Sequence, residues 1–74
     1  MGKLPVISGD EFVKAVDHIG YHWDHTEGSH MILLNENGRR LVVPRHKELG
    51  PGLLRKLIRE AGLSRAKFIG LLKK

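Results

Sequence analysis

The stretch SHMILLNENGRRLVVP, residues 29–44, carries the clearest structural signal in the chain. Two runs of β-prone residues flank Asn37-Gly38, a pair typical of the two-residue type I′ turn that joins antiparallel strands. A turn at these two residues places His30 opposite Arg45. The stretch therefore predicts a β-hairpin with His30 at one end of its first strand.

Helical patterns lie on both sides of this hairpin. Ser8 and Glu11 form a capping-box pattern, and apolar residues then recur at helical spacing, which predicts a helix over about residues 9–19. A second apolar stripe predicts a helix from about Pro51, and Ser64 can cap a short last helix.

The segment between the first helix and the hairpin, residues 21–25, predicts a short strand. We therefore expect residues 1–74 to form one α+β domain, ordered helix, three antiparallel strands, helix, helix. All helices should cover one face of the sheet.

Charge is divided unevenly along the chain, whose formal net charge is +5. Residues 1–38 carry two lysines against six acidic residues, a net charge of −4, whereas residues 39–74 carry eleven Lys and Arg against two Glu, a net charge of +9. Positive charge concentrated in one half suggests a polyanionic partner, nucleic acid above all. Solvated surface Lys and Arg would give the same composition.

Composition excludes several other classes of protein. The chain has no cysteine, so disulfides, thiolate zinc sites and thiol nucleophiles are ruled out. Its sequence shows no signal peptide and no apolar run long enough to span a membrane, so a cytoplasmic location is expected.

Four of the five histidines, namely His18, His22, His25 and His30, lie within residues 18–30. This cluster suggests a metal site, but the spacing argues against one. Successive strand residues point to opposite faces, so His22 and His25 should diverge, and no HExxH-type spacing is present. We therefore expect neither a metal nor another cofactor.

His30 differs from the other histidines in its neighbours. The predicted register brings it near Arg45, His46 and the loop that leads to the Pro51 helix, where an arginine and free N–H groups could hold a phosphate. A histidine beside a held phosphate can transfer protons in RNA cleavage through the ribose 2′-hydroxyl. The spacing alone fits more simply a strand-end histidine that hydrogen-bonds a turn.

Four segments in this order resemble the HicA toxins, also called the YcfA family, of toxin–antitoxin systems. They are KLPVISGDEFVKAV near the start, GSH at 28–30, NGRRLVVPRH at 37–46 and PGLLRKLIREAGLSRAKFIGLL from residue 51. The resemblance implies a fold like the double-stranded RNA-binding domain and an mRNA-cleaving activity that inhibits translation. It also implies a HicB-type antitoxin partner and makes His30 the catalytic residue.

The leading hypothesis is thus a metal-independent ribonuclease toxin that acts on mRNA. His30 would be the general acid or base, and His46 or Arg45 a second catalytic or phosphate-binding group. The alternatives are a non-catalytic RNA-binding module of the same fold and a histidine-rich metal protein. In the first two hypotheses the side chains that bind the RNA backbone are Arg45, Lys47, Arg55, Lys56 and Arg59.

Two features depart from the family pattern. Asp24 and Glu27 place negative charge near the G-S-H motif, where it would repel RNA. Met31, Leu33 and Val42 are expected on the outer face of the sheet, where an apolar patch would bind the antitoxin or a second copy of the chain.

Overall fold

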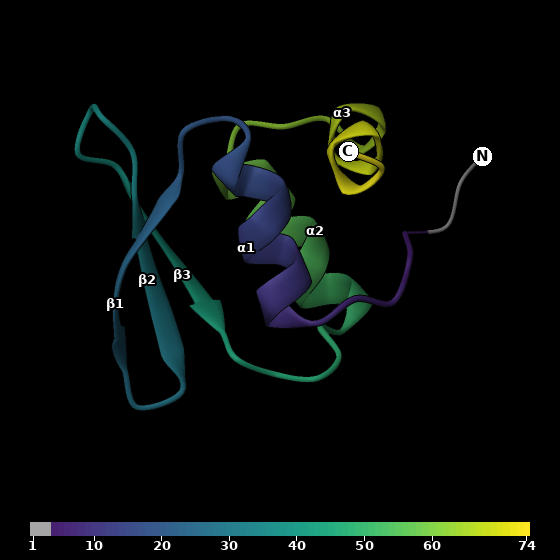
Figure 1. The fold of residues 1–74 in the computed structure, drawn as a ribbon. Helices are drawn as coiled ribbons and strands as arrows, with labels where there is room; N and C mark the ends of the chain where they lie inside the picture. Colours follow the sequence, from purple (N-terminus) through teal and green to yellow (C-terminus); the bar gives the residue numbers. More distant parts are fainter. Residues whose placement is uncertain (1–3) are drawn as a thin grey trace.

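The computed structural model describes residues 4–74, and it confirms the expected α+β architecture (Figure 1). All three helices lie on the same side of a three-stranded antiparallel sheet with strand order β1-β2-β3. None of the helices formed by residues 4–74 is long and apolar enough to cross a membrane. The elements in chain order are α1 (Gly9–Asp17), β1 (His22–Glu27), β2 (His30–Leu34), β3 (Arg40–Pro44), α2 (Pro51–Glu60) and α3 (Arg65–Leu72).

The start of α1 is fixed by its capping residues. The Glu11 amide donates a hydrogen bond to Ser8 Oγ at 3.1 Å, and the Ser8 amide donates one to Glu11 Oε1 at 2.9 Å. These two bonds satisfy backbone donors that a helix otherwise leaves unpaired. The predicted capping box is therefore confirmed, as is the cap of α3 by Ser64, whose hydroxyl accepts from the Lys67 amide.

The register of the β2–β3 hairpin corrects the sequence-based prediction by one residue. His30 lies opposite Pro44, not Arg45. The connection is not a two-residue turn, because Asn35 Oδ1 accepts hydrogen bonds from the amides of Asn37 and Arg39, and the Asn35 carbonyl accepts one from Gly38. Gly38, at φ +80°, then closes a three-residue loop. An asparagine ahead of the turn thus stabilises the longer loop.

This shift changes which residues face the helices. Met31 and Leu33 pair with Val43 and Leu41, and all four are buried in the core. The prediction that Met31 and Leu33 lie on the outer face is therefore wrong. The outer face instead carries Ile32 opposite Val42, and only Val42 of the three expected residues is exposed there.

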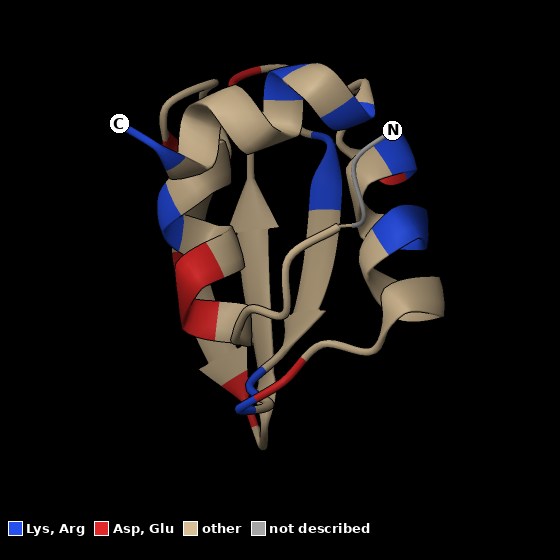
Figure 2. Cartoon of the chain, turned by 90° about the vertical axis from the view of Figure 1, so that its right-hand side faces the viewer, with Lys and Arg blue, Asp and Glu red and all other residues tan. Residues whose placement is uncertain are grey.

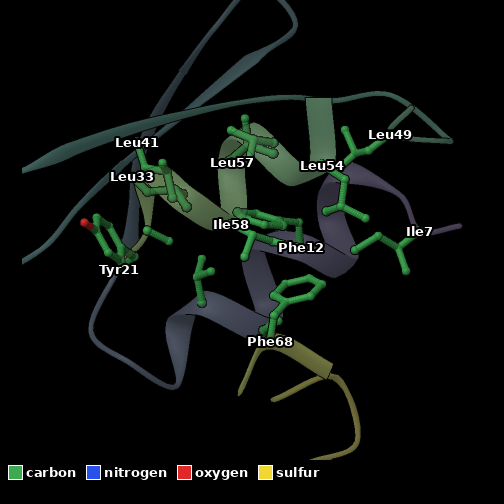
Figure 3. Packing of buried hydrophobic residues seen from close by; sticks show 14 of the residues in the cluster. Ile7, Phe12, Tyr21, Leu33, Leu41, Leu49, Leu54, Leu57, Ile58 and Phe68 are labelled. Carbon is green, nitrogen blue, oxygen red and sulfur yellow. The ribbon is translucent and has the colours of Figure 1, made fainter. Parts of the chain in front are cut away.

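The core lies between the sheet and the helices (Figure 3). Two of its aromatic rings, Phe12 of α1 and Phe68 of α3, are fully buried with their centroids 5.3 Å apart. The predicted stripe of α2 is also buried, through Leu54, Leu57 and Ile58. Burial of these apolar side chains is the main favourable term that holds the sheet and helices together.

The close approach of α1 to the end of β3 depends on a glycine. A Cβ atom at Gly9 would lie 2.2 Å from the Pro44 carbonyl oxygen. The Gly9 amide also donates a hydrogen bond of 2.9 Å to the His46 carbonyl. Gly9 therefore allows the first turn of α1 to pack directly against the chain that follows β3.

Candidate nucleic-acid interface and catalytic site

His30 is held at the edge of a tight turn in the central strand. Gly28, at φ +59°, and Ser29 connect β1 to β2, and His30 is the first residue of β2. The Ser29 carbonyl accepts a 2.7 Å hydrogen bond from the Arg45 amide, which ties this turn to the end of β3. His30 is exposed, and its imidazole has no hydrogen-bond partner within residues 4–74. Its backbone is thus fixed while its ring can reach a ligand.

An open groove of about 510 Å³, here called the β3–α2 groove, has His30 in its wall. One side consists of residues at the end and edge of the hairpin, and the other consists of one face of α2. The residues that line it are His30, Arg39, Arg40, Val42, Pro44, Leu53, Lys56, Leu57 and Glu60.

Basic side chains predominate over acidic ones in this groove. Arg39, Arg40 and Lys56 line it together with a single carboxylate, that of Glu60. Figure 2 shows Lys and Arg on α2, on α3 and at the start of β3, whereas the first turn of α1 is acidic. The excess of positive charge favours an anion such as a phosphate in this groove, which also contains a histidine.

Of the residues predicted to bind RNA, the groove contains only Lys56. Arg55 and Arg59 are exposed on α2 outside it, and Lys47 is exposed in the loop before α2. Arg45 forms an ion pair of 3.5 Å with Asp10 of α1.

The two candidates for a second catalytic group, His46 and Arg45, are likewise not groove residues. The His46 carbonyl accepts a hydrogen bond from the Gly9 amide at the start of α1, and the His46 side chain is exposed. The structure therefore does not bring either residue into the groove with His30.

Sequence reasoning missed Arg39 and Arg40 as residues of the groove that also contains His30. The sequence does indicate that Arg40, Val42 and Pro44 share a face, because every second residue of a strand points to the same side of the sheet. With Pro44 opposite His30, that alternation puts Arg40 on the histidine's face. The predicted two-residue turn shifts this alignment by one residue and would place Arg45 opposite His30, where the structure has Pro44.

The remaining histidines of the cluster have separate surroundings. His18 caps the C-terminus of α1, and His22 Nδ1 is hydrogen-bonded to Asp17 Oδ1. His25 contacts two carboxylates on its own strand. Among residues 4–74, no group of three or more His, Asp or Glu side chains is arranged to hold a metal ion.

The His25 side chain is hydrogen-bonded to Asp24 and Glu27, the two acidic residues of β1 that were expected to repel RNA. Its Nε2 lies 2.7 Å from Glu27 Oε2, and its Nδ1 lies 2.7 Å from Asp24 Oδ2. The hydrogen bonds from Glu27 and then Asp24 raise the pKa of His25, and the bond to His25 lowers the pKa of Glu27. A protonated His25 therefore offsets part of the negative charge beside the G-S-H turn.

These pKa shifts predict a pH-dependent contribution of His25 to stability. The raised pKa of His25 means that its contribution is complete below about pH 6.5 and is lost as pH rises through the folded-state pKa. The lowered pKa of Glu27 means that its contribution is lost as pH falls below about 4.5. We expect His25→Gln to lower the urea midpoint most between about pH 5 and 6, and less above neutrality.

The measurement is a pH series of urea unfolding curves, together with NMR titration of the His25 ring. His18→Gln is the matched control, since His18 is exposed and has no such carboxylate pair within residues 4–74. A His25 ring that titrates below the ordinary histidine value would contradict this assignment.

Comparison with known proteins assigns the family. Residues 9–63 of the 74-residue chain match the family model described as the HicA toxin of bacterial toxin–antitoxin systems. No curated protein matches the chain. The matched range begins at Gly9, includes the G-S-H turn and the whole sheet, and ends just after α2. On this match, the chain belongs to the HicA toxin family of bacterial toxin–antitoxin systems.

Proposed function

We propose that this protein is a metal-independent endoribonuclease that cleaves mRNA in the β3–α2 groove, with His30 as the general acid or base. In the reaction, a base removes the proton of a ribose 2′-hydroxyl, and the 2′ oxygen attacks the adjacent phosphorus. The bond from phosphorus to the 5′ oxygen breaks, and that oxygen takes up a proton. The products are a 2′,3′-cyclic phosphate and a 5′-hydroxyl, and the protein needs to supply only proton transfer and charge stabilisation.

The observation that supports this proposal most strongly is that His30 shares one groove with three basic side chains. Arg39, Arg40 and Lys56 can hold the phosphate and stabilise charge that develops on it. His30, exposed and without a hydrogen-bond partner among the described residues, can then reach the 2′-hydroxyl or the leaving oxygen. No other histidine of residues 4–74 lines this groove.

The test is incubation of a labelled mRNA fragment with the purified protein in the presence of a chelator. A ribonuclease of the proposed kind shortens the RNA under these conditions. The non-catalytic RNA-binding alternative shifts the RNA in a gel without shortening it. Loss of cleavage on chelation, with recovery on addition of a divalent metal, would contradict the metal-independent mechanism.

The basic residues fall into two groups, those that line the β3–α2 groove and those that lie outside it. We expect Lys56→Gln and Arg40→Gln to weaken RNA binding more than the control Arg59→Gln, because only the first two residues line the groove. Each lost phosphate contact should reduce the slope of log affinity against log salt concentration by about 0.7 for a single strand. Arg45, Lys47, Arg55 and Arg59 should contribute mainly through longer-range attraction, which salt screens.

Filter-binding or fluorescence titrations at several salt concentrations measure these slopes. Catalytically inactive His30→Ala is the background for every variant, so that cleavage does not distort the binding curves. Equal weakening by Lys56→Gln and Arg59→Gln at low salt would contradict RNA binding in the groove.

A toxin of this family implies an antitoxin partner. We propose that this partner is a HicB-type protein in the same cytoplasmic compartment, and that it blocks the β3–α2 groove. The exposed Val42 at the groove, together with its basic side chains, offers an apolar centre with a charged rim. The same face could instead pair two copies of the chain, and the mass of the purified protein in solution distinguishes these assemblies.

A further inference from the structure

The strand that forms one wall of the groove has a free edge. β3 pairs with β2 along one side, and no strand formed by residues 4–74 pairs with its other side. Two hydrogen bonds show which residues of β3 point their backbone groups toward β2. The Asn35 N–H donates to the Arg39 carbonyl at 3.1 Å, and the Arg45 N–H donates to the Ser29 carbonyl at 2.7 Å. Odd-numbered residues of β3 thus exchange hydrogen bonds with β2.

The even-numbered residues consequently direct their backbone groups away from β2. The β2–β3 register runs without a bulge, so the N–H and C=O groups of Arg40 and Val42 point to the free edge. Neither residue makes a backbone hydrogen bond outside the ladder within residues 4–74. Both residues line the β3–α2 groove. The groove therefore contains main-chain donors and acceptors in addition to its charged side chains.

The chemistry of the groove matches that of a single nucleotide. Its volume of about 510 Å³ falls within the range of about 300–1,000 Å³ typical of small-ligand sites. The exposed Val42 and the half-buried Leu53 provide apolar surface for the face of a base, and the β3 edge provides partners for the base's polar edge. The basic side chains provide partners for its phosphate.

An RNA duplex cannot use such a site. In A-form RNA the Watson–Crick edges are paired, and the deep, narrow major groove is closed to side chains. Unpaired nucleotides, in contrast, can turn out of a strand and present both a face and a polar edge. We infer that the free edge of β3 and the apolar wall of α2 bind one unpaired nucleotide next to His30, which restricts the substrate to single-stranded RNA. This inference rests on the proposed function and names its substrate class.

An extended peptide is the other possible occupant of a free strand edge. Two features of the groove favour RNA. Three basic side chains and a histidine oppose one carboxylate there, and Pro44, which lacks an N–H group, ends the edge after only two usable residues. A peptide strand needs a longer run of free backbone groups than Arg40 and Val42 provide.

The inference is tested with three RNAs of one sequence: a single strand, a perfect duplex, and a duplex with one bulged nucleotide. We expect the wild-type protein to cut the single strand throughout, to cut the bulged duplex only at the bulge, and to leave the perfect duplex intact. Cleavage of the perfect duplex at the rate of the single strand would overturn the inference and leave the proposed ribonuclease function standing.

Binding is measured separately, with a single strand whose ribose 2′-hydroxyls are methylated and cannot react. We expect the NMR amide signals of Arg40 and Val42 to shift on its addition. Affinity for the single strand should exceed affinity for a duplex by about tenfold or more, because a duplex cannot form the hydrogen bonds to the strand edge. If these amide signals shift but the protein cleaves no RNA, the proposed ribonuclease function is refuted and the nucleotide-binding site is supported. An acidic peptide that shifts these amides when RNA does not would overturn the nucleotide site.

Val42→Pro removes the N–H group at the free edge while leaving the β2–β3 ladder bonds, because proline is tolerated at outward-facing edge positions. We expect this variant to lose about tenfold in single-strand affinity. Val42→Ile is the matched control, since it keeps both the N–H group and an apolar β-branched side chain. If Val42→Pro unfolds, the amide shifts of the wild-type protein still decide the question.

Discussion

Replacement of His30 by alanine is expected to lower the rate of RNA cleavage by about 10²–10⁴-fold, the usual contribution of a general acid–base group. His30 is the only histidine among residues 4–74 in the β3–α2 groove, so no neighbouring imidazole is placed to substitute for it. Its side chain is exposed and packs into no core cluster, so the substitution should leave the fold intact. Single-turnover cleavage of a labelled RNA measures the rate.

Two histidine controls make this experiment specific. His18→Ala changes an exposed histidine at the end of α1, and His46→Ala changes the second motif histidine, which does not line the groove. Both variants should keep cleavage close to that of the wild-type protein. Full activity in a folded His30→Ala variant would refute the catalytic assignment, and loss of activity in His46→Ala would add a second group to the site.

The second large effect concerns stability and comes from Gly9. Gly9→Ala places a methyl group 2.2 Å from the Pro44 carbonyl oxygen, a distance that no Cβ contact tolerates without a backbone shift. Overpacking of this kind costs about 1–3 kcal/mol or more. A 74-residue domain has a total stability of roughly 4–11 kcal/mol. At about 4–8 °C per kcal/mol, the melting temperature should fall by about 5–25 °C.

Gly70→Ala is the matched control for this substitution. Gly70 lies within α3, and a Cβ atom there would meet no heavy atom within 4 Å. Alanine loses less backbone entropy than glycine on folding, so this variant should be more stable by about 0.4–1 kcal/mol. Thermal or urea unfolding of both variants measures the opposite effects. A Gly9→Ala variant as stable as the wild-type protein would show that α1 does not need close contact with Pro44.

Most of the fold could be predicted from the sequence because its signals are local. The Ser8 and Glu11 capping box and the apolar stripe of α2 depend on residues three or four apart, and each specifies its helix without help from the rest of the chain. The β-hairpin was equally clear from its two β-prone runs. The element order and the position of the helices on one sheet face follow from these local features.

The register of the hairpin could not be predicted in the same way. Asn37-Gly38 fits a two-residue turn, whereas the Asn35 side chain stabilises a three-residue loop with two hydrogen bonds. A shift of one residue moves every side chain of a strand to the opposite face. This single error explains why Met31 and Leu33 were placed on the outer face, and why Arg45 rather than Pro44 was placed opposite His30.

The candidate site was predicted only in part because it depends on this register and on tertiary packing. His30 and Lys56 come from separate elements that meet in one groove, and the sequence indicated each of them separately. The hydrogen bond from His25 to Asp24 was missed, because alternation along an ideal strand puts adjacent side chains on opposite faces. The β1–β2 ladder is irregular between Trp23 and His25, which removes that regular alternation.

The most direct test of the proposed mechanism is the chemical nature of the RNA ends that the protein produces. Cleavage by attack of the 2′-hydroxyl predicts a 2′,3′-cyclic phosphate on one fragment and a 5′-hydroxyl on the other, with a chelator present. Mass spectrometry of the fragments identifies both ends, and a single 2′-deoxy nucleotide at the cleavage site should prevent the reaction there. Fragments with 5′-phosphate and 3′-hydroxyl ends, or cleavage at the 2′-deoxy nucleotide, would contradict the mechanism.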